Sequence, residues 1–77
     1  MVGTKRLMRM APVESSCVAA AGYDGTRHVL RIRFVEGRTY DYLGVPEPVF
    51  EGFQAADSKG RYVNCVVKPH YAVRRAR

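Results

Sequence analysis

A pair of short alternating segments constrains the fold of this chain more than any other feature. The first segment is Leu30–Phe34 (LRIRF) and the second is Thr39–Tyr42 (TYDY), with Glu36-Gly37 between them. In both segments, bulky apolar or aromatic side chains alternate with charged or hydroxyl side chains, and a period of two sends successive residues to opposite faces of a sheet. The pattern predicts an antiparallel β-hairpin.

The loop length sets the register of this hairpin. A two-residue loop would place Ile32 opposite Asp41 and so set a carboxylate beside the apolar row. A three-residue loop over 35–37, with Gly37 in the left-handed conformation, avoids this mismatch. It gives the pairs Ile32 with Tyr40 and Leu30 with Tyr42. The two tyrosines are therefore expected in or beside the core.

The same register places two arginines on the opposite face of the hairpin. Arg31 would lie opposite Asp41, and Arg33 opposite Thr39. Both arginines are expected to be solvated, and an exposed ion pair of this kind contributes at most about 1 kcal/mol. If this face binds a partner, the two arginines are its most prominent contacts.

Other strand and turn signals precede the hairpin. Ser15–Tyr23 is predicted to be a first strand, with an irregularity among its alanines, and Asp24-Gly25 follows as a turn. The connection is longer than two residues, so the second strand is expected to begin near His28.

A helix is predicted after the hairpin. Val45–Pro48 (VPEP) forces an extended residue and then a proline-tolerant first helical turn, and apolar residues follow at helical spacing. The helix is expected to end near Ser58–Gly60, with Gly60 as a left-handed cap. Gly52 in its interior costs about 1 kcal/mol relative to alanine, which indicates a close packing neighbour. Residues 61–67 could form a short strand or a helical turn.

The predicted fold is therefore a small α+β domain. We expect an antiparallel sheet of about three strands in β-β-β-α order, one short helix packed on it, and a further short element. The domain is assigned to residues 13–71, between a flexible basic arm (1–12) and a basic tail (72–77).

Charge is concentrated outside the predicted domain. The net charge is +6, yet residues 13–71 hold seven basic and seven acidic side chains. The excess lies in the arm and the tail, at Lys5, Arg6, Arg9, Arg74, Arg75 and Arg77. The chain is thus predicted to be a neutral domain with two basic extensions, which suits carboxylate or phosphate partners equally well.

Cysteine usage and hydropathy favour a soluble cytoplasmic protein. Cys17 and Cys65 are far apart and lack the spacing of a disulfide framework, so free buried thiols are expected. A zinc site from these cysteines with His28 and His70 matches no recognised spacing, and no cofactor is expected. Neither a secretory signal nor a membrane-spanning run is apparent.

Several of these elements, taken in order, resemble the KTSC domain, a family named for its occurrence at the carboxyl end of some lysyl-tRNA synthetases. They are Val13-Glu14-Ser15-Ser16, Gly22-Tyr23-Asp24, Leu30-x-Ile32-x-Phe34, Gly37, Tyr40-x-Tyr42, Val45-Pro46, Ser58-x-Gly60-x-Tyr62-x-Asn64 and Tyr71.

The resemblance implies a β-sheet domain with a helix, without established catalysis, for which RNA binding has been suggested. Similar small phage proteins include a transcription regulator that binds bacterial RNA polymerase and affects initiation and termination. Ala21 and Val63 depart from the family pattern, which usually has a larger aliphatic and often an aromatic residue there.

The first functional hypothesis is a monomeric, non-catalytic adaptor that binds the transcription machinery, with RNA polymerase as the expected partner, and modulates initiation or termination. Its methionine-containing basic arm suits an acidic, partly apolar protein groove. The contacts predicted for this role are Lys5, Arg6, Leu7, Met8, Arg9 and Met10, with Arg31 and Arg33 on the sheet.

The alternative is a nucleic-acid-binding module. In this reading Tyr40, Tyr42 or Tyr62 stack bases, and the tail residues Arg74, Arg75 and Arg77 contact phosphates. Core packing is the competing role for the tyrosines.

Catalysis is not expected. Ser15, Ser16, Asp24, His28 and Asp41 show no nucleophile-elbow pattern, and the chain has no phosphate-binding glycine loop.

Overall fold

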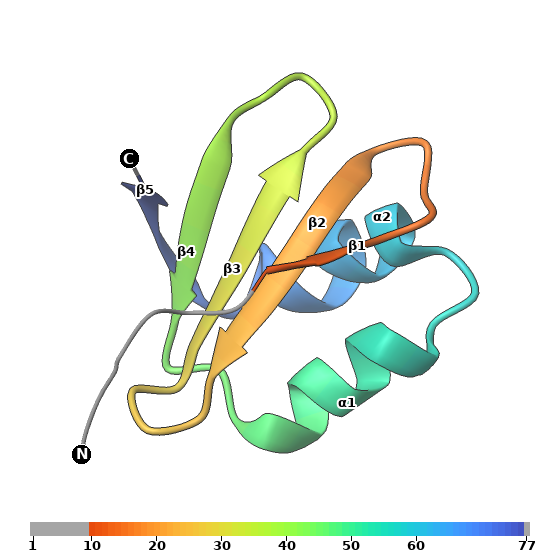
Figure 1. Ribbon diagram of the computed structural model, residues 1–77. Helices are drawn as coiled ribbons and strands as arrows, with labels where there is room; N and C mark the ends of the chain where they lie inside the picture. The colour runs from red at the N-terminus through yellow and green to blue at the C-terminus, as the bar shows by residue number, and fades with distance from the viewer. Residues whose placement is uncertain (1–9, 77) are drawn as a thin grey trace, which may run out of the picture.

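A five-stranded antiparallel sheet with helices on one side forms the protein (Figure 1). The computed structural model describes residues 10–76, and the strands follow one another in the order β1-β2-β3-β4-β5. The elements are β1 (Ala11–Pro12), β2 (Val18–Asp24), β3 (Val29–Phe34), β4 (Thr39–Leu43), α1 (Glu47–Ala55), α2 (Lys59–Tyr62), a π-helical segment (Val63–Val67) and β5 (Ala72–Ala76). No helix in the described part of the chain is long and apolar enough to cross a membrane.

The predicted hairpin register is confirmed. Ile32 pairs with Tyr40 and Leu30 with Tyr42, so the apolar row of β3 faces the tyrosines of β4. The loop between them has three residues, and Gly37 has a φ of 108°, a backbone conformation that glycine adopts without steric cost.

The strand predicted over Ser15–Tyr23 corresponds to β2, and it contains the predicted irregularity. A register shift between Val18 and Ala20 marks a bulge in β2. The turn that follows is held by Asp24, whose Oδ1 accepts hydrogen bonds from the N–H groups of Thr26 and Arg27. His28 closes this turn with a φ of 57°.

The helical region begins as predicted and ends earlier. Pro46 is the extended N-cap of α1, but α1 stops at Ala55, three residues before the predicted end at Ser58. Lys59 explains the stop, because its Nζ donates to the carbonyl oxygens of Gln54 and Ala56 and satisfies the end of the helix.

Gly60 is not the predicted left-handed cap. It is buried inside α2, where an added Cβ would meet the Cβ of Cys17 at 3.1 Å. Ser58 is the N-cap of α2, and its Oγ accepts a hydrogen bond from the N–H of Arg61. Residues 61–67 are helical, so the alternative of a short strand is excluded.

The core lies between the sheet and the helices. Side chains from β2, β3, β4, the β4–α1 connection, α1 and the π-helical segment meet there. The largest fully buried ones are Phe53, Leu30, Ile32, Val18, Val45, Val63 and Val67. Tyr23 closes the core at one side, donating its hydroxyl hydrogen to the Val45 carbonyl at 2.6 Å and stacking on Phe50. Burial raises the pKa of this phenol, and Glu47 and Asp24 add to the effect.

The prediction of about three strands was wrong, because the two outermost strands lie in segments assigned to the flexible extensions. β1 is only two residues long and contains a proline, so it has no alternation to detect. β5 is exposed on both faces, and its arginines therefore resemble a solvated tail.

Candidate functional site

The strand β5 is an open edge of the sheet. It pairs with β4 on one side, and no strand of the described region pairs with it on the other. Edge strands that remain unpaired can accept a strand from another chain. Most of its residues are exposed, including Val73, which with Val35 is one of two large apolar residues exposed in the part of the chain described.

A groove runs beside this edge, on the side of the sheet that carries the helices. It has a volume of about 380 Å³, and its lining comes from β3, the β3–β4 loop, β4, the turn before β5, and β5: Phe34, Glu36, Tyr40, Tyr42, Lys68 and Val73. We call it the β5 groove. It combines an aromatic surface with one acidic and one basic side chain.

The aromatic side chains of the β5 groove are held in place by one another. The rings of Phe34 and Tyr40 pack edge to face with centroids 5.9 Å apart. The Lys68 ammonium lies 5.4 Å from the centre of the Phe34 ring, within the range of a cation–π interaction. Tyr42 is buried, and the burial raises the pKa of its phenol, with a smaller contribution from Tyr40.

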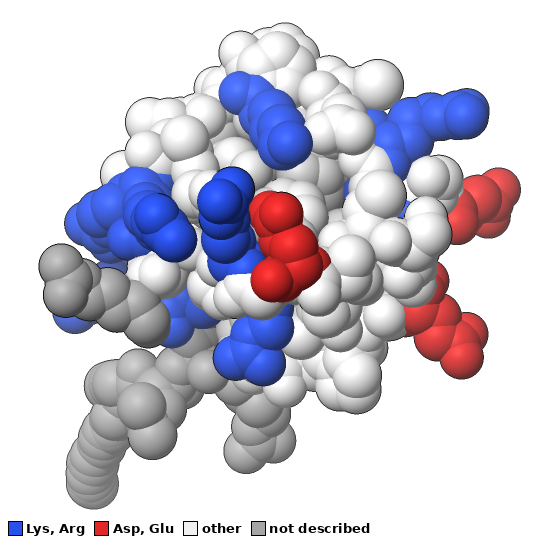
Figure 2. Space-filling model, turned by 90° about the horizontal axis from the view of Figure 1, so that it is seen from above, with Lys and Arg blue, Asp and Glu red and all other residues white. Residues whose placement is uncertain are grey.

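Positive charge surrounds this part of the molecule. Residues 29–43 and 68–76 carry six basic and two acidic side chains, whereas 10–28 and 44–67 carry three basic and five acidic ones. Figure 2 looks down on the end of the sheet with the β3–β4 loop and shows basic side chains clustered on one side and beside an acidic one near the centre, with acidic and basic side chains projecting on the other side. Without Arg74 and Arg75, residues 29–43 and 68–71 still carry four basic and two acidic side chains, so the overall neutrality of residues 13–71 conceals an uneven distribution of charge.

The other face of the same strands carries an ion-pair cluster. Arg31 binds both oxygens of Asp41, Nε to Oδ1 at 2.7 Å and Nη2 to Oδ2 at 3.0 Å, and Arg74 approaches Oδ2 at 3.9 Å. The hydrogen bond to Asp41 raises the pKa of the Arg31 guanidinium. The prediction of an exposed pair was wrong for Asp41, which is only 4% exposed because it lies between two arginines on neighbouring strands.

The structure places the predicted arm contacts only in part. Lys5, Arg6, Leu7, Met8 and Arg9 lie outside the described residues, as does Arg77 of the tail. Met10 is half-buried directly before β1. The arm contacts remain a prediction.

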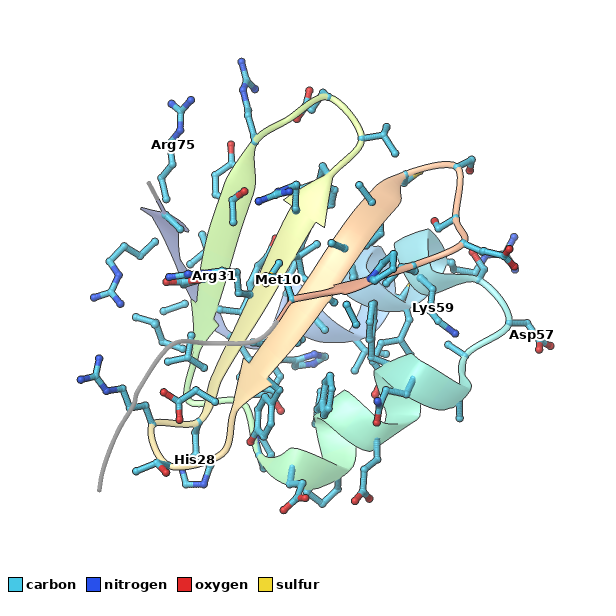
Figure 3. The ribbon with its side chains drawn as sticks, in the orientation of Figure 1. Met10, His28, Arg31, Asp57, Lys59 and Arg75 are labelled. Atoms are coloured by element: carbon cyan, nitrogen blue, oxygen red, sulfur yellow. The ribbon has the colours of Figure 1, made fainter. Side chains whose placement is uncertain are left out.

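The sheet and tail arginines divide between two faces. Arg33 is exposed beside Thr39, as predicted, on the face of Arg31 and Arg74. Arg75 pairs with Tyr40 and therefore belongs to the groove side of β5. It extends outward from the sheet edge, on the opposite side of the molecule from Asp57 and Lys59 (Figure 3).

The three tyrosines proposed for base stacking lie in different surroundings. Tyr40 is half-buried and lines the β5 groove, while Tyr42 is a core residue. Tyr62 lies elsewhere and donates its hydroxyl hydrogen to the Val49 carbonyl oxygen at 2.9 Å. The three rings therefore do not form one platform.

A second groove of about 430 Å³ lies between β1 and α1 and includes Pro12, Phe50 and Lys59. Like the β5 groove, its lining includes one acidic and one basic side chain, Glu14 and Lys59. Two residues of the β5 groove, Tyr40 and Tyr42, were among the predicted contacts, but neither groove as a whole was predicted, because each joins segments that are distant along the chain.

The two cysteines are exposed, so the prediction of buried thiols was wrong. Cys17 lies in the turn before β2, against Gly60, and Cys65 lies in the π-helical segment. Within residues 10–76, no three potential metal ligands of the His, Cys, Asp and Glu types come together.

The fold is that of a small α+β domain. Helices cover one face of its antiparallel β-sheet, and the edge strand β5, which carries Arg74 and Arg75, is open. The sequence matches the KTSC domain family over residues 14–71, and the chain belongs to this family. Both departures noted above, Ala21 and Val63, are core positions, where the side chains pack between the sheet and the helices.

Two relatives support the assignment. A KTSC domain protein of Yersinia pestis, known from a crystal structure, is 40% identical and superposes with a TM-score of 0.86 over 92% of this chain and 100% of its own. A protein of Tsukamurella paurometabola is 52% identical over 62 residues, which span 80% of this chain and 92% of that protein.

Proposed function

We propose that this chain is a non-catalytic adaptor that binds an acidic, partly apolar segment of a protein of the transcription machinery and thereby modulates initiation or termination. The β5 groove supports this role, because its aromatic and apolar lining lies beside an open strand, with the basic residues Lys68 and Arg75 on the same side of the sheet. Such a site can take up apolar side chains while its rim attracts carboxylates.

The expected partner is a subunit of RNA polymerase. This part of the proposal rests on the resemblance to small phage regulators described above.

Two exposed valines provide a matched test. Val73 is 54% exposed and lines the β5 groove, whereas Val35 is 59% exposed in the β3–β4 loop and does not line it. We expect wild type and Val35→Glu to capture polymerase subunits from nuclease-treated bacterial lysate. Val73→Glu should lower the recovery about tenfold, a change equivalent to 1.4 kcal/mol, because it adds a charge that repels an acidic segment.

The amounts of each subunit are measured by mass spectrometry after affinity purification. Circular dichroism of both variants controls for folding. Recovery that is equal for the two variants would remove the β5 groove from the interface, and recovery of no polymerase subunit by wild type would remove the proposed partner.

Nucleic acid is the second candidate partner, because six basic side chains surround the β5 region against two acidic ones. Phosphate contacts would make such binding strongly dependent on salt. A mobility-shift assay with single-stranded RNA at two salt concentrations separates the candidates, and the absence of a shift at low salt would exclude this one.

A further inference from the structure

We infer that the partner segment binds as a sixth strand, antiparallel to β5, with acidic side chains opposite Arg74 and apolar side chains entering the β5 groove. This inference rests on the proposed function, since it presupposes that the chain binds a protein segment. It adds the conformation of that segment and the pattern of its side chains.

The backbone of β5 has hydrogen-bonding groups available on its outer side. The Phe34 N–H donates to the Arg38 carbonyl oxygen at 2.9 Å, which fixes the phase of the β3–β4 ladder. Hydrogen-bonded and non-hydrogen-bonded pairs alternate in an antiparallel ladder. The backbone groups of Tyr40 and Tyr42 therefore point to β3, and those of Asp41 point to β5.

The same alternation continues into β5. Arg74, the partner of Asp41, directs its N–H and C=O toward β4, so those of Val73 and Arg75 point away from the sheet. Neither residue is a proline, and both are exposed. Val73 and Arg75 therefore each present one N–H donor and one C=O acceptor on the outer side of β5. They are two residues apart, which is the spacing of hydrogen-bonding residues in an antiparallel ladder.

Side-chain directions predict the pattern of the added strand. Val73 and Arg75 lie opposite Tyr42 and Tyr40, and Val73 also lines the β5 groove. Residues of the added strand opposite these two would face the groove, so apolar residues suit these positions. The residue between them would face Arg74.

An acidic residue is expected at the position of the added strand opposite Arg74, because the two charges attract each other. The Arg74 side chain is 64% exposed, and at 3.9 Å its contact with Asp41 leaves donors for another carboxylate. A carboxylate at this position would therefore give Arg74 a second and closer counter-charge than Asp41, which is already bound by Arg31.

A second copy of this chain is a poor occupant of the same edge. Antiparallel pairing of two β5 strands over their whole length would set Ala72 opposite Ala76 and Arg74 opposite its own copy. Like charges directly opposite one another destabilise a sheet. The other edge is also less suitable, since β1 has only two residues and one of them is Pro12, which has no N–H.

The probe for this inference is a blocked heptapeptide of alternating Glu and Val, titrated into the 15N-labelled full chain. In the proposed complex the valine N–H groups face β5 and the glutamate N–H groups face solvent. Methylation of the valine nitrogens should weaken binding at least about tenfold, whereas methylation of the glutamate nitrogens should leave it unchanged. The largest shifts are expected at the Val73 and Arg75 amides.

Protein variants provide an independent control. Val73→Pro removes one outward N–H and should weaken the peptide about tenfold, whereas Val73→Ala keeps the N–H and should weaken it less. Dispersed NMR spectra of both variants establish folding. If Val73→Pro fails to fold, the methylated peptides still decide the question.

Several results would overturn the inference. These are no binding of the Glu-Val peptide at millimolar concentration, equal binding of a Lys-Val peptide, equal binding of the valine-methylated peptide, and tighter binding of heptauridylate at β5. Recovery of polymerase that Val73→Glu abolishes and Val73→Pro leaves unchanged would overturn strand addition while retaining the proposed function.

Discussion

The Asp41 carboxylate shows how a single charged residue is accommodated in this sheet. Both of its oxygens are bound by Arg31, whose side chain is 33% exposed and thus keeps contact with water. A buried charge is tolerated when a partner compensates its lost hydration, and removing that partner leaves the charge uncompensated. Arg31 is therefore expected to contribute to stability more than a surface arginine does.

This expectation can be tested with two arginines of one strand. Arg31→Met should lower the free energy of unfolding by about 3 kcal/mol, because it leaves Asp41 buried with only the more distant Arg74 nearby. Arg33→Met, two residues along β3 and exposed, should change it by less than about 0.5 kcal/mol. Urea denaturation at neutral pH measures both, and equal stability of the two variants would contradict this account of Asp41.

At the scale of the elements, Gly52 fixes how α2 packs on α1. A Cβ at this position would overlap the Tyr62 hydroxyl and lie 3.0 Å from its Cζ. The absence of a side chain lets the tyrosine cross α1 and bind the Val49 carbonyl. The close packing neighbour predicted from the sequence is thus confirmed and is Tyr62.

The prediction at this position reverses the usual order of helix propensities. Alanine normally stabilises a helix interior by about 1 kcal/mol relative to glycine, but Gly52→Ala should destabilise this protein by about 1–3 kcal/mol through overpacking. The loss should shrink in a Tyr62→Leu background, which lacks the overlapping hydroxyl. Thermal and urea denaturation of the four proteins of this cycle would measure the coupling, and a stabilising effect of Gly52→Ala in the wild-type background would show that the contact is absent.

The sequence predicts elements well where the pattern is local. Alternation and one glycine were enough for the β3–β4 register, and Pro46 marked the start of α1. The end of α1 depends on Lys59, which reaches back from the next helix, and that contact has no signature in the sequence.

The edge strand β5 was missed for a different reason. Its residues are exposed on both faces, and strand prediction depends on one buried face. Pairing with β4, rather than burial of its own side chains, makes this segment a strand.

At the scale of the whole molecule, the arrangement of charge matters more than its sum. The sequence located the excess of basic residues in the extensions, and the structure places two of them, Arg74 and Arg75, in a strand beside Lys68 and the sheet arginines. The candidate site could not be predicted because it joins β3, β4, the turn before β5 and β5, which only the tertiary fold brings together.

The central claim is that the β5 edge and its groove form the surface that binds a partner protein. Hydrogen exchange, measured by mass spectrometry on the free chain and on its complex with the captured partner, tests this claim most directly. We expect the amides of Val73 and Arg75 to gain protection on binding, while those of the exposed face of α1 remain unchanged. Protection confined to α1 or to the groove beside β1, with unchanged exchange in β5, would contradict it.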